Sequence, residues 1–148
     1  LIDLNRTLCT DIGSGSGLPG IVLAIIMKHK NSNMKFVLYE KSFHKSNFLK
    51  EVTSKFNLNV EVLQKDIFKE KNLQSDIIVA RAFKPLPVII NLIHNNFKSF
   101  KEVILFLGKS GKEILGEAIN EWKFEFEEKK SITNDDSIII KIKNLEKK

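Results

Sequence analysis

The fold of this 148-residue chain is decided by one stretch, Asp11-Ile12-Gly13-Ser14-Gly15-Ser16-Gly17-Leu18-Pro19-Gly20. It follows an apolar run over residues 8–12 that reads as a strand, and it leads into a helical segment that begins near Pro19. Glycine has no Cβ, so alternating glycines let the backbone turn sharply and approach a ligand closely. A strand, a glycine-rich turn and a helix in this order are typical of an α/β sheet that binds a ligand at the carboxyl end of its first strand.

The rest of the chain alternates short apolar runs with longer amphipathic ones. Strands are expected at residues 8–12, 35–40, 60–64, 76–82 and 103–107, helices at 19–27, 42–56, 87–97 and 112–122, and a final hairpin at 124–127 and 137–142. Strands joined by helices form right-handed crossovers and therefore a parallel sheet. The pattern predicts one α/β domain over residues 1–148, with a mainly parallel seven-stranded sheet and an antiparallel C-terminal strand.

The glycine-rich turn fits two cofactors. Gly15, Gly17 and Gly20 satisfy the GxGxxG pattern of dinucleotide-binding sheets, which would make the chain an NAD-dependent oxidoreductase. Gly13, Gly15 and Gly17, with Asp11 two residues ahead, form the GxGxG pattern that is usual where the ligand is S-adenosyl-L-methionine. A turn that serves packing alone is the third and weaker interpretation.

Acidic residues after the next two strands weigh on this choice. Glu40 follows the second strand and is placed to bind the ribose hydroxyls of either cofactor. Asp66 follows the third strand, a region that contacts adenine in methyltransferases of this fold, so it favours S-adenosyl-L-methionine. Asp11 points the same way, because a carboxylate is unhelpful beside a pyrophosphate but can pair with the cationic end of methionine.

Beyond these patterns, the stretch from Asp11 to Ile21 closely resembles the first motif of the RsmG family, also called GidB. The three residues Leu18-Pro19-Gly20 are distinctive of that family. Further stretches resemble it too, the last only loosely: Tyr39-Glu40-Lys41 with Lys45 and Phe48-Leu49, Val79-Ala80-Arg81-Ala82-Phe83, and Leu107-Gly108-Lys109. The resemblance covers nearly the whole chain and implies a Rossmann-like class I S-adenosylmethionine-dependent methyltransferase.

The family methylates nitrogen-7 of one guanine in the 530 loop of bacterial 16S rRNA. The resemblance therefore implies S-adenosyl-L-methionine as cofactor and 16S rRNA or the small ribosomal subunit as partner, in the cytoplasm. The turn residues and the matched motifs together give these expected cofactor contacts: Asp11, Gly13, Gly15, Gly17, Leu18, Glu40, Asp66, Ile67, Phe68 and Arg81.

The sequence also departs from the family pattern. The family often has Arg-x-Glu where this chain has Asp66-Ile67-Phe68, and its strand-five lysine is Leu107 here, with Lys109 displaced by two positions. The helical segment that normally precedes the first strand has no counterpart before Leu8. We therefore expect a methyltransferase core that lacks the N-terminal segment of the family.

Methyl transfer to nitrogen-7 of guanine needs few catalytic groups. That nitrogen is a lone-pair acceptor without a proton, so no general base is required. The chain accordingly has three scattered histidines and no pattern of metal ligands. Arg81 is the expected catalytic residue, holding either the guanine edge or the cofactor carboxylate. The alternative is a surface arginine that balances Asp76 or Glu40.

The formal net charge of +6 favours a polyanionic partner. Lys84, Lys109 and Lys112 follow strand ends on the edge of the glycine turn, where they are expected to meet RNA phosphates, although each is about as easily a solvated lysine. Phe83 either stacks on a flipped base or packs in the core. A non-catalytic RNA-binding domain of the same fold is the remaining alternative.

Four further expectations concern membrane spans, the single cysteine, the oligomeric state and metals. No apolar stretch approaches the roughly 20 residues that span a bilayer. The single cysteine, Cys9, lies in an apolar run and is expected to be a buried, inert thiol, which suits a reducing cytoplasm. Nothing in the sequence demands more than a monomer, and no metal is expected.

Overall fold

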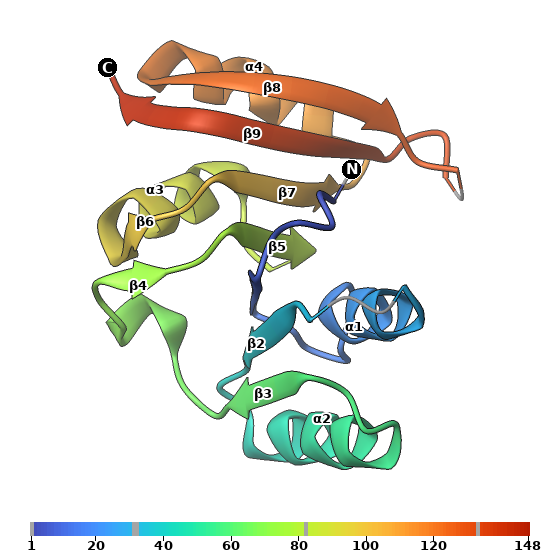
Figure 1. The fold of residues 1–148 in the computed structure, drawn as a ribbon. Helices are drawn as coiled ribbons and strands as arrows, with labels where there is room; N and C mark the ends of the chain where they lie inside the picture. The colour runs from blue at the N-terminus through green and yellow to red at the C-terminus, as the bar shows by residue number, and fades with distance from the viewer. Residues whose placement is uncertain (1, 31–32, 82, 133) are drawn as a thin grey trace.

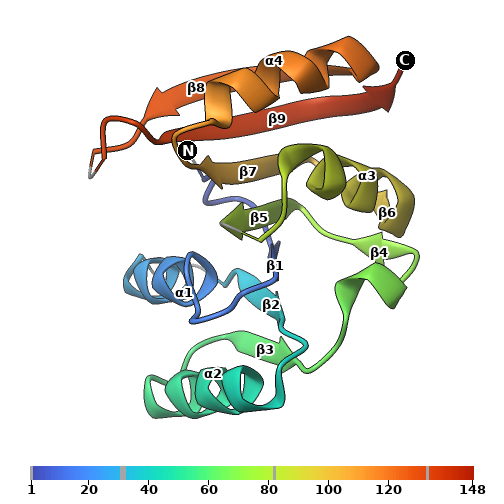
Figure 2. The same ribbon diagram turned by 180° about the vertical axis from the view of Figure 1, so that it is seen from behind.

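A computed structural model describes residues 2–30, 33–81, 83–132 and 134–148 of the chain (Figures 1 and 2). The elements, in chain order, are β1 (Leu8–Ile12), α1 (Gly20–His29), β2 (Lys35–Tyr39), α2 (Phe43–Lys55), β3 (Val60–Leu63), the 3-10 helix η1 (Ile67–Lys69), β4 (Leu73–Gln74), β5 (Ile77–Arg81), α3 (Leu86–Asn96), β6 (Phe97–Ser99), β7 (Glu102–Leu107), α4 (Gly111–Glu121), β8 (Trp122–Lys130) and β9 (Ile138–Lys147). Ala82, which the sequence placed at the end of the fourth strand, lies outside the described residues.

Seven strands form the main sheet in the order β3-β2-β1-β5-β7-β9-β8. The pairs from β3 to β7 are parallel, whereas β9 runs antiparallel to both β7 and β8. This arrangement confirms the predicted α/β class, with its mainly parallel sheet and antiparallel C-terminal strand. It also brings the carboxyl ends of β1, β2, β3 and β5 to one edge.

Each face of the sheet has its own hydrophobic core. The first core joins Ile77 and Val79 of β5 to the buried side of α1 and to Leu49 of α2. The second joins Ile78 and Ala80 of the same strand to α3 and α4. Because β5 is covered on both faces, all four of these side chains are buried, which is why its sequence reads as a continuous apolar run.

Two features of the fold were not predicted. β4 and β6 pair in parallel as a separate two-stranded sheet, and η1 precedes them; each has two or three residues, too few to show a periodic pattern. Trp122, expected at the end of a helix, instead begins β8 opposite Lys147. Its indole is fully buried under the second core, so tertiary packing decides this boundary.

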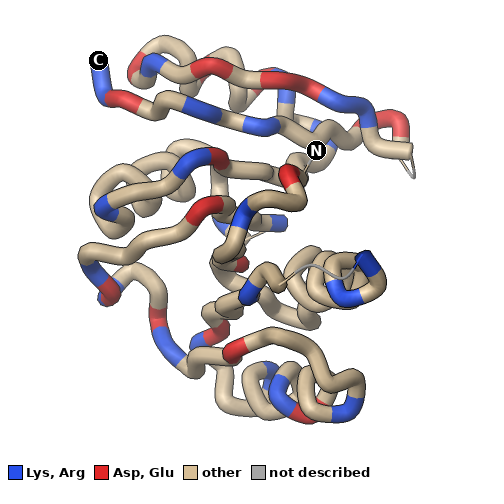
Figure 3. The backbone as a smooth tube through the Cα atoms, in the orientation of Figure 1, with Lys and Arg blue, Asp and Glu red and all other residues tan. Residues whose placement is uncertain are grey.

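The charges are spread over the chain rather than gathered in one region. In Figure 3, basic and acidic residues are mixed along β8 and β9, and further lysines lie on α1 and α2. None of the described helices is both long enough and apolar enough to cross a bilayer. Because the charges are mixed over the chain, the lysines and arginines that could bind an anionic ligand are best identified by their position around a cavity.

Candidate functional site

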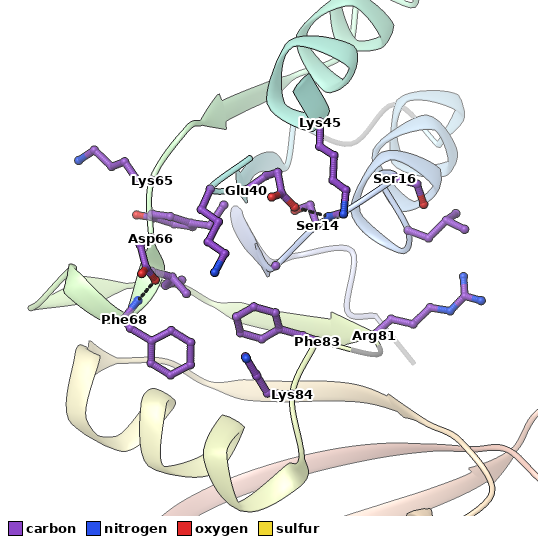
Figure 4. A pocket seen from close by; sticks show the side chains of 16 residues that line it. Ser14, Ser16, Glu40, Lys45, Lys65, Asp66, Phe68, Arg81, Phe83 and Lys84 are labelled. Atoms are coloured by element: carbon purple, nitrogen blue, oxygen red, sulfur yellow. Dashed lines mark hydrogen bonds between the residues drawn. The ribbon is translucent and has the colours of Figure 1, made fainter. Parts of the chain in front are cut away.

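A cavity of about 610 Å³ lies at the carboxyl edge of the sheet, between the ends of β1, β2, β3 and β5 (Figure 4). Its size is in the range of sites that hold a cofactor or a small ligand. Eight of the ten residues expected to contact the cofactor line it: Gly13, Gly15, Leu18, Glu40, Asp66, Ile67, Phe68 and Arg81. The other two, Asp11 and Gly17, lie behind this wall.

The glycine turn forms one wall of the cavity. Gly13, Gly15 and Gly17 have φ values of 70°, 56° and 95°, a left-handed backbone that side chains with a Cβ disfavour. A Cβ at Gly15 would meet nothing nearer than a carbonyl oxygen 3.9 Å away, so the backbone there is open to the cavity. Gly17 instead leaves room for Ile21 and Leu49, and its part is to seat α1.

Glu40 ties this wall to the end of β2. One oxygen of its carboxylate accepts a hydrogen bond from the amide of Gly15 (2.9 Å) and the other from the amide of Ser42 (2.8 Å). The residue is 8% exposed and lines the cavity. A carboxylate oxygen has more than one lone pair, so Glu40 holds the turn and can still accept hydrogen bonds from a ligand.

Asp11 lies beneath the turn and is fully buried. Its carboxylate accepts a hydrogen bond from the amide of Gly20 (2.8 Å), at the first residue of α1. A Cβ at Gly20 would lie 2.5 Å from that carboxylate oxygen, so a glycine is needed here for the close approach. Burial raises the pKa of Asp11 to about 7, although the Gly20 amide opposes this rise. The structure thus directs Asp11 toward the start of α1.

The facing wall is formed by η1, which includes Phe68, and by Phe83. Asp66 caps η1 by accepting a hydrogen bond from the amide of Phe68 (3.1 Å). The Phe68 ring is 40% exposed and lies 5.9 Å, centre to centre, from the ring of Phe83. Phe83 is packed directly on Gly13, where a Cβ would overlap its ring. The Phe83 ring lines the cavity and also packs against the second core, so the core interpretation is confirmed in part and stacking on a base stays a prediction.

Arg81 is the last residue of β5, Lys84 follows it, and both are exposed at the cavity. In Figure 4 the Arg81 side chain extends away from Phe83. It has no hydrogen bond or ion pair with any described residue. The two acids suggested as its surface partners are engaged elsewhere: Asp76 with Lys101 (2.9 Å) and Glu40 with backbone amides. Its guanidinium is therefore free to meet a ligand.

The three lysines expected to bind RNA lie in different places. Lys84 lines the cavity, whereas Lys109 and Lys112 lie off its wall, after β7. Lys112 forms an ion pair with Glu128 (3.2 Å). Conversely, Lys41 and Lys45 line the cavity and were not singled out for RNA. Their position at the end of β2 and the start of α2 was the signal that would have found them.

Other reactive groups lie away from this site. Cys9 is buried in β1, and burial raises the pKa of its thiol, so it is inert as expected. Within the described ranges, no three His, Cys, Asp or Glu side chains are grouped as metal ligands. The cavity therefore offers amides, two tethered carboxylates, free cations and aromatic rings.

Comparison with known proteins now identifies the family. The model of the GidB family, described as rRNA small subunit methyltransferase G, matches residues 1–138. The chain belongs to the GidB family. Two relatives named ribosomal RNA small subunit methyltransferase G are 50% identical over 99% of this chain, in Pelagibacter ubique, and 34% identical over 99%, in Rickettsia africae. The chain spans 69% and 72% of their respective lengths.

Solved structures agree on the fold of this GidB-family chain. TrmK of M. capricolum, solved with S-adenosyl-homocysteine, superposes with a TM-score of 0.67 at 16% identity, over 94% of this chain and 62% of that one. A mutant of MtNAS solved with S-adenosylmethionine gives 0.71 at 16% identity, over 94% and 55%. The resemblance stated from sequence is thus confirmed. The chain is an S-adenosylmethionine-dependent methyltransferase, and the alternative of an NAD-dependent oxidoreductase is wrong.

Proposed function

We propose that this domain transfers the methyl group of S-adenosyl-L-methionine to nitrogen-7 of a guanine in the 530 loop of 16S rRNA. The observation that carries the proposal is a single cavity that joins a glycine turn tethered by Glu40 to an unpaired Arg81. The seven-stranded main sheet runs through the described part of the chain and carries a hydrophobic core on each face, which supports one methyltransferase domain. Because every proposed group lies on one chain, we propose that it acts as a monomer, in the cytoplasm.

The residues of the cavity fit an adenosyl ligand. The open backbone at Gly15 admits close approach, and Glu40 can accept hydrogen bonds from two ribose hydroxyls. The wall from Asp66 to Phe68 offers an apolar and aromatic surface on which an adenine can lie. When bound, S-adenosyl-L-methionine supplies an electrophilic methyl group on a sulfonium. Asp11 contributes indirectly, by fixing the turn against the first residue of α1.

Arg81 is proposed as the catalytic residue. Guanine nitrogen-7 needs no base to remove a proton, so the enzyme has only to orient the ring for in-line attack. The planar guanidinium of Arg81 carries five N–H donors, which can hold the O6 edge of guanine or, alternatively, the cofactor carboxylate. Phe83 lines the same cavity from the side of Gly13 and Phe68, and we propose that it stacks on the base.

Cations around the cavity support an RNA substrate. Lys41, Lys45 and Lys84 line it, and none of their side chains pairs with a described residue. Lysines without carboxylate partners bind phosphates by releasing the counterions that surround RNA. Lys109 and Lys112 stay predictions for phosphates farther from the target base.

Incubation with labelled S-adenosyl-L-methionine and unmodified 16S rRNA tests the proposal. We expect one methyl group per rRNA, and mass mapping should locate it on a guanine of the 530 loop. Parallel reactions with assembled small subunits show which form is the substrate. Labelling at another base overturns the assigned target. Binding of RNA without any transfer supports the non-catalytic alternative instead.

A further inference from the structure

We propose that Asn96 is a positioning residue that holds the Asp66–Phe68 wall of the cavity in place for the cofactor. Asn96 is the last residue of α3 and lies outside the cavity lining and outside every motif noted in the sequence. The inference rests on the cofactor role proposed for that wall. It concerns how the wall is held, which the contacts of Asn96 show.

The Asn96 side chain is buried, at 4% exposure, and reaches back to a segment more than 25 residues earlier in the chain. Its amide nitrogen donates to the carbonyl oxygens of Ile67 (3.0 Å), Phe68 (3.2 Å) and Glu70 (2.7 Å). Its amide oxygen accepts a hydrogen bond from Nζ of Lys71 (3.0 Å). One side chain therefore gathers both ends of η1.

These contacts answer a need of the local backbone. A single turn of 3-10 helix supplies few backbone donors to its carbonyl oxygens, and buried carbonyls require partners. The Ile67 carbonyl accepts from the Glu70 amide (3.2 Å) as well as from Asn96. The amide of Asn96 brings two hydrogens to three such oxygens, so one hydrogen is shared. A carboxylate of the same shape would bring none and would repel the carbonyls.

The hydrogen bonds of Asn96 hold the Asp66–Phe68 wall of the cavity in position. Ile67 is anchored in the second core, and the adjoining Phe68 ring projects to the cavity beside Phe83. Just beyond η1, Leu73 of β4 pairs with Phe97, the residue after Asn96. The end of α3 and the start of β6 thus hold residues 66–74 together. A wall that is no longer held in its binding position must be ordered when the cofactor binds, so we expect weaker binding.

The test compares two neighbouring asparagines. Asn96→Asp keeps the size of the side chain but replaces the donor with an acceptor. We expect the Kd for S-adenosyl-homocysteine and the KM for S-adenosyl-L-methionine to rise about tenfold, with kcat at saturating cofactor within twofold of the unchanged enzyme. Asn95→Asp is the matched control, because Asn95 is exposed and takes the same change of charge. We expect its constants to stay unchanged.

Two further measurements separate positioning from general damage. Lys71→Met removes the partner of the amide oxygen but leaves the three donated bonds, so we expect a rise in Kd of threefold or less. Hydrogen exchange at the amides of Lys69 and Glu70 should speed up in Asn96→Asp while the amides of β1 and β5 stay protected. If Asn96→Asp does not fold, Asn96→Ala takes its place, since it removes the donors without adding charge.

The inference is overturned if the substitutions at Asn96 and Asn95 give the same Kd, or if kcat falls while cofactor binding is unchanged. Because Kd is measured without RNA, the outcome is independent of the proposed substrate. An unchanged enzyme that binds S-adenosyl-homocysteine but methylates no rRNA would refute the proposed function alone.

Discussion

The wall made by the glycine turn and the stretch around the end of β5 are built in opposite ways. In the wall made by the glycine turn, Glu40 is bonded to two backbone amides and Asp11 to a third. At the end of β5 and just beyond it, Arg81 and Lys84 have no polar partner among the described residues. The glycine-turn wall is therefore fixed before any ligand binds, whereas Arg81 and Lys84 keep their hydrogen-bond donors available. Groups that are already held in place bind the cofactor in the same way at every turnover. Unpaired donors remain available to bind the RNA group that reacts.

The largest expected effect comes from a substitution at the end of β5. Arg81→Ala should lower kcat for methyl transfer by about 10³-fold, because a donor that orients the reacting groups is lost. The fold should survive, since the exposed Arg81 side chain contacts no polar group in the described chain. Methyl transfer and the circular dichroism spectrum measure the two effects. Near-normal turnover would refute the catalytic role.

Next in size is a substitution in the fixed wall. Glu40→Ala removes the acceptor for the amides of Gly15 and Ser42 together with the proposed ribose contact. We expect the affinity for S-adenosyl-homocysteine to fall about 100-fold, measured by calorimetry. Glu61→Ala, on the exposed side of β3, is the control and should bind normally. If both variants bind alike, the wall does not depend on Glu40.

A pH dependence sharpens the comparison further. The pKa of Asp11 is about 7 in the folded chain, above its value of 3.8 in the unfolded chain, so the folded state binds more protons between those values. This single group should therefore lower the free energy of unfolding by on the order of 2 kcal/mol between pH 5 and pH 8. Asp11→Asn should flatten that part of the profile, as measured by urea unfolding. An unchanged slope would show that another group is responsible.

The smallest effect tests which lysines meet RNA. Lys45→Met should raise the KM for rRNA severalfold. The slope of the logarithm of the binding constant against the logarithm of salt concentration should fall by about the amount expected for one phosphate contact. Lys112→Met is the comparison, because Lys112 lies off the cavity and pairs with Glu128. Equal effects of the two substitutions would mean that RNA covers the face beyond β7 as well.

Much of the fold and part of the site follow from the sequence. The carboxyl ends of parallel strands share one edge, so strand assignment alone places the glycine turn, Glu40 and Arg81 around one cavity. The direction of a side chain is harder to predict. The sequence pattern predicts that Asp11 lies in β1. It does not predict the hydrogen bond from the Gly20 amide that the Asp11 carboxylate accepts.

Asn96 shows where such prediction ends. Its partners are backbone carbonyls, which no residue type reveals, and they belong to a 3-10 turn too short for any periodicity. The same limit hides β4 and β6, whose pairing depends on contacts between distant residues. Sequence patterns thus describe the long elements and miss the short pieces that hold a cavity wall.

The order of the last two strands has a consequence for assembly. β9 follows β8 in the chain, yet it lies between β7 and β8, so β8 has no ladder with the rest of the sheet except through β9. While a ribosome is making this chain, the strands around the cavity can pair as they emerge, but the edge of β7 stays bare until β9 arrives. A bare strand edge invites pairing with other chains. The strand that covers the edge of β7 therefore comes later in the chain than every strand around the cavity.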